Sequence, residues 1–228
     1  MIKVAQCWDD GVYTDIRLIE LLRKYNAKAT FNLCPGIMAE ETVKARGLAL
    51  GEESWSFHGF CAGRIGLKDL VEVYSDFQVA SHCMHHEVAG QCEIEKFKAG
   101  AVDAKKFLED LFQRECPGFA WPCGGVTDEA IEVLKENGFA YARTTEYTTD
   151  VTKNTNPYRL DSNCHFKDGR FWSKFQEAKA NGVGAFYFWG HTYEMMDSPC
   201  MWQQLEDKIA ALSADPDVVW VDVVDLVR

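Results

Sequence analysis

Short apolar stretches of β-favouring residues alternate with segments of helical periodicity along nearly the whole chain. Stretches typical of strands cover 2–8, 29–33, 77–80, 118–121, 139–143, 183–189 and 218–221. Between them, apolar residues recur at helical spacing over 12–22, 67–74, 94–112, 127–137, 171–180 and 202–212, and 144–167 is irregular. Strands separated by helices imply βαβ units and a parallel sheet with both faces covered. The pattern predicts an α/β fold, and a barrel and a doubly wound sheet both fit it.

Composition narrows the class of protein. No repeat, linker or low-complexity segment interrupts the 228 residues, so we expect a single domain over 1–228. No apolar run approaches the roughly 18 residues of a membrane span, and a net charge of −11 disfavours DNA or RNA as a partner. The nine cysteines form no C-x-x-C pair, and the first residues run into two acids rather than a secretory signal. We expect a reduced, cytoplasmic protein with no membrane or nucleic-acid partner, and the oligomeric state stays unknown.

Two adjacent acids, Asp9 and Asp10, followed by Gly11, come directly after the first expected strand. Ligands of parallel α/β folds gather beyond the carboxyl ends of the strands, so polar residues at these positions are candidate site residues. A helix cap with a second acid near the positive end of the helix dipole is the structural alternative. In a site, one acid could bind a metal ion while its uncoordinated neighbour acts as a base.

Three of the six histidines lie within residues 82–86, after another expected strand. On a helical turn, His82 and His86 at i and i+4 would share one face, with Cβ atoms about 5–6 Å apart, and could bind one cation. The pair His82 and His85 is the geometric competitor, and a solvated helix start is the structural alternative. Two imidazoles and one carboxylate leave coordination positions open, which suits a catalytic divalent transition metal such as Zn²⁺.

Two further strand ends carry candidate residues. His191 follows the stretch 183–189, either as a core histidine or as a general acid, because the unperturbed pKa of histidine lies near neutrality. A Pro/Gly turn over 122–125 follows the stretch 118–121. It is either simple turn chemistry or a device that aims the Cys123 N–H at developing negative charge.

Taken in chain order, these motifs resemble those of the polysaccharide deacetylases, carbohydrate esterase family four, also called the NodB-homology domain. The family's T-F-D-D-G reads C-W-D-D-G at 7–11, its H-[ST]-x-x-H reads H-C-M-H-H at 82–86, and its L-x-H reads W-G-H at 189–191. The resemblance implies a distorted (β/α)7 barrel. It also implies Asp9 as catalytic base, Asp10, His82 and His86 as ligands of a divalent metal, most simply Zn with Ni, Co or Fe as alternatives, and His191 as the acid.

The third and fourth motifs depart from the family pattern. R-x-P-[YF]-G is similar to A-W-P-C-G at 120–124, which keeps the backbone N–H of Cys123 as oxyanion donor but lacks the arginine and the ring. Our hypothesis is that Arg143, at the end of a neighbouring strand, orients the base instead. D-x-x-D-W has no counterpart in 144–161, and the orienter of His191 stays open among Asp161, His165, Asp168 and Asp222.

The resemblance predicts a metal-dependent amide hydrolase that removes an N-acetyl group from a saccharide or related small molecule. Trp121 and Trp189 are the candidate stacking surfaces for a sugar ring, although large aromatic residues are also typical of a core. Two alternatives remain. One is a hydrolase of a non-sugar amide, cyclic imide or ureide, and the other is a non-catalytic carbohydrate-binding protein on a degenerate barrel.

Overall fold

A parallel sheet forms the centre of the molecule in the computed structural model, which describes residues 1–196 and 198–228. Its strands are β1 (Ile2–Asp9), β2 (Thr30–Leu33), β5 (Gln78–Ser81), β6 (Gly118–Ala120), β7 (Tyr141–Tyr147), β8 (Leu160–Ser162), β9 (Cys164–His165), β10 (Ala185–Gly190) and β11 (Val218–Trp220). They follow the order β8-β7-β6-β5-β2-β1-β10-β9, and β11 also pairs with β1. Every pairing in this sheet is parallel, as the alternation of strands and helices predicts.

The sheet curls into a nearly closed barrel, which decides between the two architectures that the sequence allows. Asn163, between β8 and β9, links one end of the strand order to β10. Its N–H donates to the Tyr187 carbonyl at 2.7 Å, and its side-chain oxygen accepts from the Tyr187 N–H at 2.8 Å. This is the barrel architecture that the resemblance of the motifs implies.

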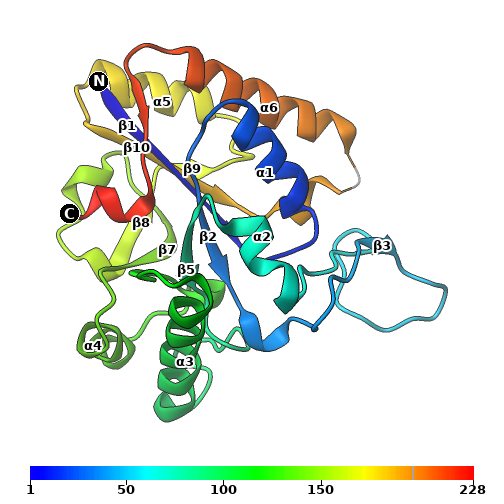
Figure 1. Ribbon diagram of the computed structural model, residues 1–228. Coiled ribbons are helices and arrows are strands. Elements are labelled where there is room, and N and C mark those ends of the chain that lie inside the picture. The colour runs from blue at the N-terminus through cyan, green and yellow to red at the C-terminus, as the bar shows by residue number, and fades with distance from the viewer. Residues whose placement is uncertain (197) are drawn as a thin grey trace.

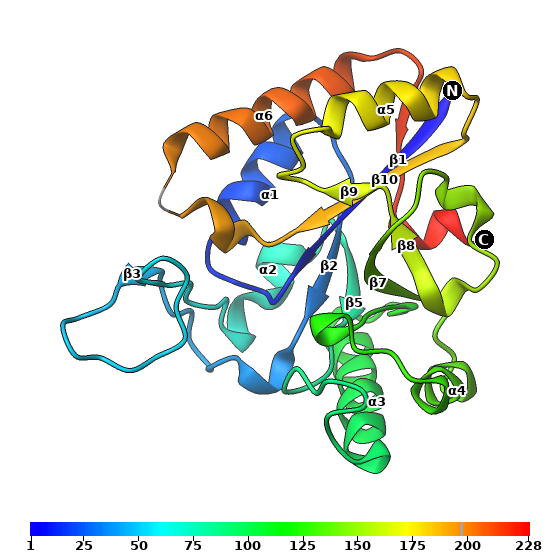
Figure 2. The same cartoon turned by 180° about the vertical axis from the view of Figure 1, so that it is seen from behind.

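Helices cover the outside of the barrel. They are α1 (Asp15–Lys24), α2 (Leu70–Tyr74), α3 (Ile94–Phe112), α4 (Asp128–Glu136), α5 (Phe171–Ala180) and α6 (Pro199–Ala214). α1, α5 and α6 lie beside one another along one side, and α3 and α4 cover the opposite side (Figures 1 and 2). None of the described helices is long and apolar enough to span a membrane.

Strand side chains alternate between the helix layer and the barrel interior. On β1, Val4 and Trp8 pack in the cluster under the helices, whereas Ala5 and Cys7 pack inside with Tyr187 of β10. Both faces are therefore buried, which is why the strands read as apolar runs rather than as polar–apolar alternation. Because side chains alternate between the two faces, the odd-numbered residues near the carboxyl ends of β1 and β7 also point into the barrel interior.

The expected elements agree with the structure except over 144–167. Helices α3 and α5 have the expected bounds, and the strand expected over 183–189 is β10. The segment predicted as irregular instead contains the end of β7 and the short strands β8 and β9. These strands are two or three residues long, so they carry too few side chains to show a period, and their pairing with β7 and β10 defines them.

A long excursion between β2 and α2 leaves the barrel. It carries the two-residue strands β3 (Arg46–Gly47) and β4 (Phe60–Cys61), which pair in an antiparallel hairpin. The hairpin stands away from the helices in both views (Figures 1 and 2). Leu50 at its tip is fully exposed, whereas Trp55 turns back toward the barrel and meets Tyr193 with ring centroids 5.0 Å apart.

Candidate active site

A pocket of about 410 Å³ opens at the carboxyl ends of the barrel strands. Asp9 ends β1 and Asp10 follows it, His82 and His86 come after β5, and His191 comes after β10. The other lining residues are Ile37, Trp55, Arg64, Trp121, Cys123, Arg143, Thr145, Trp189 and Tyr193. Cys123 in the turn after β6 lines the pocket as well, so the four strand ends singled out in the sequence meet in one cavity.

Asp9 is the last residue of β1, and its side chain points into the barrel at 3% exposure. One carboxylate oxygen accepts a hydrogen bond from the Asn32 amide at 2.7 Å, and the other pairs with the Arg143 guanidinium. Burial by itself raises the pKa of this carboxyl, but Arg143, His82, His191 and Asn32 outweigh burial and hold the pKa well below its usual range. Asp9 is thus an ionised, buried carboxylate, which is the state a base requires.

Arg143 lies where the hypothesis about the missing motif arginine requires it. β7 pairs with β6, and the inward period of β7 places Arg143 across the interior from Asp9. Its guanidinium also lies over the Trp189 ring, 4.5 Å from the centroid. A single cation from a different strand therefore fixes the predicted base, and its role in catalysis stays a prediction.

Asp10, His82 and His86 converge, although no helical turn brings the histidines together. The segment after β5 is a loop in which Cys83 and His86 both adopt left-handed backbone conformations, with φ of 62°. The expected i, i+4 helix geometry is wrong for this reason. The loop still brings the two imidazole rings to a centroid separation of 4.7 Å, and Nε2 of each lies 3.9 Å from Oδ1 of Asp10.

These three side chains fit a divalent metal ion. A separation of 3.9 Å is too long for a hydrogen bond, yet it lets each pair of donors reach one ion about 2.0–2.2 Å from either atom. Nδ1 of His82 lies 2.7 Å from the Ala120 carbonyl, which makes Nδ1 the donor and leaves the Nε2 lone pair free. Burial lowers the pKa of His82 to about 4, so the ring is neutral. Buried Cys34 lies close enough to Asp10 and His82 for its sulfur to complete a further donor set.

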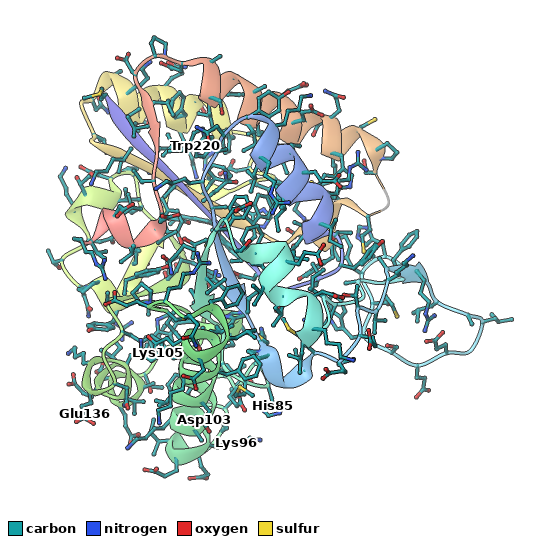
Figure 3. The ribbon with its side chains drawn as sticks, in the orientation of Figure 1. His85, Lys96, Asp103, Lys105, Glu136 and Trp220 are labelled. Carbon is teal, nitrogen blue, oxygen red and sulfur yellow. The ribbon has the colours of Figure 1, made fainter. Side chains whose placement is uncertain are left out.

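His85, the geometric competitor, does not join this group. Its side chain is 60% exposed and its Nδ1 lies 3.2 Å from Glu87, on the surface beside α3 (Figure 3). Glu87 also accepts from the His85 backbone N–H at 2.9 Å. The structure therefore favours His82 and His86 as the pair that faces Asp10.

His191 follows β10 and faces Asp9, with Nε2 3.7 Å from Oδ2. Its other nitrogen, Nδ1, lies 3.6 Å from Glu194, which in turn accepts from His165 at 2.9 Å and pairs with Lys167 at 2.7 Å. Burial lowers the pKa of His191, but Glu194, Asp9 and Asp10 outweigh burial and raise it. A raised pKa favours the protonated form of His191, which is the form that an acid requires.

Glu194 is the residue that lies beside Nδ1 of His191, where the sequence left the orienter of this histidine open. Of the four expected orienters, His165 reaches His191 only through Glu194. Asp161 instead accepts from Thr144, and Asp168 and Asp222 pair with Lys174 and Lys28. These last three expectations are wrong because each carboxylate is turned toward its own neighbour. The available signal was a carboxylate three residues after His191, which is the spacing of a reciprocal cap.

The turn after β6 presents Cys123 to the pocket. Cys123 adopts φ of 52°, and the N–H groups of Gly124 and Gly125 are used within the turn by the carbonyls of Trp121 and Pro122. Among the described residues the Cys123 N–H has no such backbone partner. The turn is therefore built as an oxyanion donor requires, with a thiol where the family pattern has a ring.

The two predicted stacking residues differ in their surroundings. Trp121 is fully buried, its ring stacks on Phe97 at 5.7 Å, and its indole N–H donates to the Tyr158 carbonyl. Trp121 thus closes the pocket wall, and its burial disfavours a stacking role. Trp189 is 8% exposed above Arg143, and its indole nitrogen has no partner among the described residues.

The fold and the site together define the class of protein. It is a parallel α/β barrel with paired carboxylates and imidazoles at the carboxyl ends of its strands. A family model described as "Polysaccharide deacetylase" matches residues 2–142, a span that includes Asp10, His82 and His86 and ends before Arg143 and His191. The chain belongs to the polysaccharide deacetylase family. This confirms the resemblance carried by the motifs. A search of curated proteins gives no match.

Solved structures agree on the fold at low sequence identity. The Bc1960 peptidoglycan N-acetylglucosamine deacetylase has a TM-score of 0.61 and 12% identity, with 98% of this chain and 87% of that chain covered. A putative polysaccharide deacetylase from Mycobacterium smegmatis has a TM-score of 0.58 and 14% identity, over 100% and 90%. BA3943, described as a family-four pseudoenzyme from Bacillus anthracis, has a TM-score of 0.57 and 13% identity, over 99% and 65%.

Proposed function

We propose that the protein is a metal-dependent deacetylase that releases acetate from an N-acetylated saccharide or a related small amide. The observation that supports this most directly is the convergence of Asp10, His82 and His86 on one point of a pocket that also holds Asp9 and His191. A base, an acid and a donor set that fits a divalent metal, all within a few ångströms of one another, are the parts that amide hydrolysis by water requires.

Asp10, His82 and His86 would hold the metal. When bound there, a divalent ion such as Zn²⁺ supplies Lewis acidity, which polarises an acyl oxygen and acidifies water. His82 is fixed for this purpose by the Ala120 carbonyl, and Arg64 steadies the turn that carries Asp10 by donating to its backbone carbonyl at 2.6 Å.

Asp9 would take the proton from the attacking water. Its carboxylate is held by Asn32 and Arg143 at the pocket floor, so it cannot rotate away, and the guanidinium keeps it ionised. His191 would donate a proton to the departing nitrogen, because Glu194 and Asp9 together favour its protonated form. The surroundings of the two groups thus favour an ionised Asp9 beside a protonated His191.

The N–H of Cys123 would stabilise the oxyanion that forms as the acyl carbon becomes tetrahedral. A backbone donor in this position needs only the turn geometry, which the proline at 122 and the glycines at 124 and 125 provide. Loss of the family's aromatic ring therefore does not remove this contribution.

Turnover is favoured over binding alone. Although BA3943 is described as a pseudoenzyme, the groups with which this chain would act are present and supported, including the buried pair of Arg143 and Asp9 that replaces the missing motif arginine. A buried ion pair is costly to retain in a site that only binds sugar, since apolar residues of similar volume are often equally stable. The reduced, cytoplasmic setting inferred from the cysteines belongs to the same proposal.

The test is metal content and acetate release measured on the same preparations. We expect about one equivalent of divalent metal per chain, with loss of both metal and activity in Asp10→Asn and in His82→Gln. His85→Gln is the matched control and should retain both, because its ring faces solvent and Glu87. Full activity in a metal-free Asp10→Asn variant contradicts the proposal. A panel of N-acetylated sugars, simple amides, cyclic imides and ureides decides the substrate class, and turnover of the last three alone rejects the saccharide.

A further inference from the structure

A second pocket, of about 310 Å³, lies beside the first and is lined by residues of the excursion between β2 and α2. It shares Ile37, Trp55 and Arg64 with the catalytic pocket, so the two cavities are adjacent. Both volumes fall in the range of about 300–1,000 Å³ typical of ligand sites. The proposed chemistry uses only the first pocket, which leaves the second without a role.

The walls of the second pocket are cationic. Lys44, Arg46 and Arg64 line it, and the described lining includes no carboxylate. This contrasts with the catalytic pocket, which contains Asp9 and Asp10, and with a chain whose net charge is −11. Arg46 is already paired with Glu52, so Lys44 and Arg64 are the cations that make negative charge locally favourable in this pocket.

The three cationic side chains differ in the hydrogen-bond and ion-pair partners that they already have. Arg64 uses one N–H on the Asp10 carbonyl and retains its other donors. Lys44 is exposed and has no hydrogen-bond or ion-pair partner among the described residues. Lys44 is therefore the cation that is free to bind a ligand, and Arg64 connects it to the catalytic pocket.

Arg46 of the second pocket already binds a carboxylate of the chain. Its guanidinium binds Glu52 through two hydrogen bonds, of 2.9 and 2.6 Å, from within the excursion itself. The bidentate geometry is the one that arginine makes with a carboxylate. A carboxylate of the chain thus already reaches one cation of this pocket, and a ligand carboxylate would meet the other two.

An aromatic wall joins the two pockets. Trp55 lines both, is 55% exposed, and packs edge-on against Tyr193, which lines the catalytic pocket beside His191. Exposed indole rings next to polar groups are typical surfaces for sugar rings. A saccharide with one residue in each pocket would lie across Trp55.

We propose that the second pocket is a subsite for a carboxylate-bearing sugar, so that the preferred substrate is an acidic saccharide in which this sugar neighbours the N-acetylated residue. The inference deepens the proposed deacetylase function and rests on it for the reaction, but not for binding. Lys44 and Arg64 would bind the carboxylate, and Trp55 would support the link between the two sugars. Because the rest of the surface is acidic, selectivity comes from this pocket rather than from long-range attraction of a polyanion.

Binding is measured by calorimetry with two matched ligands. One is a hyaluronan tetrasaccharide, in which N-acetylglucosamine alternates with glucuronic acid, and the other is the same tetrasaccharide with its carboxyl groups reduced to alcohols. The protein is the His191→Ala variant, which retains the metal ligands, and acetate release is assayed separately with the unmodified protein. We expect the acidic ligand to bind about three- to fivefold more tightly, with the difference shrinking as salt is added.

Variants locate the effect. Lys44→Met should abolish the preference while leaving the affinity for the reduced ligand unchanged, and Lys44→Glu should weaken the acidic ligand about tenfold. Lys96→Met, at an exposed position of α3 (Figure 3), is the control and should retain the preference. Equal binding of both ligands, or a preference that persists in Lys44→Met, overturns the subsite. Preferential binding without acetate release supports the subsite and contradicts the deacetylase instead, and binding of neither ligand overturns the subsite.

Discussion

The buried pair of Arg143 and Asp9 makes the sharpest prediction about stability and activity together. Replacing Arg143 by Met keeps most of the volume of the side chain but leaves a carboxylate that is 3% exposed without its cation. At an effective dielectric constant of about 20, two charges about 4 Å apart interact by about 4 kcal/mol. Removing one member of a buried pair costs about 3–5 kcal/mol in other proteins.

The lower part of that range applies here, because Asn32 and His191 still face Asp9 in the variant. We therefore expect Arg143→Met to lose about 3 kcal/mol of unfolding free energy at pH 7.5, measured by urea denaturation. The pKa of Asp9 is held below its usual range in the folded protein, so the stabilisation is present above about pH 4 and is lost as pH falls further. In the variant the carboxyl can be protonated, and the deficit should shrink as pH falls toward 4.

Activity provides an independent measure of the same interaction. Asp9 must be ionised to act as a base, and a neighbouring arginine lowers the pKa of an aspartate by about 1–3 units. The acid limb of kcat/KM should therefore move upward by about 1–3 pH units in Arg143→Met.

Arg170→Met is the matched control. Its side chain is 78% exposed and 4.0 Å from Asp168, so it should change stability by less than about 1 kcal/mol and leave the acid limb in place. A loss of less than about 1 kcal/mol in Arg143→Met, together with an unmoved acid limb, contradicts this role of the ion pair.

Three further predictions follow from other contacts. Glu194→Gln should move the basic limb of the pH–rate profile downward, because Glu194 raises the pKa of His191; an unmoved limb contradicts that role. Burial raises the pKa of Asp15 to about 7, so the folded state holds a proton that the unfolded state loses near pH 4, and stability should fall by up to about 4 kcal/mol between pH 4 and 7. Asp15→Asn should flatten this decline in urea titrations, and an unchanged slope counts against it. Gly190→Ala should cost about 1–3 kcal/mol in unfolding free energy, because its Cβ would lie 2.1 Å from the Phe166 ring; a neutral effect shows that the ring moves aside.

The periodicity of apolar residues and the polar residues at the strand ends predict most of the fold and much of the site. The run of strands and helices predicts parallel pairing, and the residues at four strand ends meet in one pocket. Local sequence succeeds here because a parallel sheet sends the carboxyl ends of all its strands to the same edge. The same reasoning failed for the short strands β8 and β9, which only their partners define.

Placement across the barrel could not be derived from local sequence. Arg143 reaches Asp9 over 134 positions of chain, and Glu194 replaces three expected orienters because each of those carboxylates faces another cation or hydroxyl. His82 and His86 meet through two left-handed residues rather than a helical turn.

The sequence alone determined which chemical groups stand at the strand ends, since order along the chain is enough to bring them to one edge of a parallel sheet. Only the tertiary structure decided which charges face one another, because closing the sheet into a barrel brings distant strands into contact across its interior. Tertiary structure also formed the cationic pocket beside the catalytic one, within an excursion whose residues carry no periodic signal.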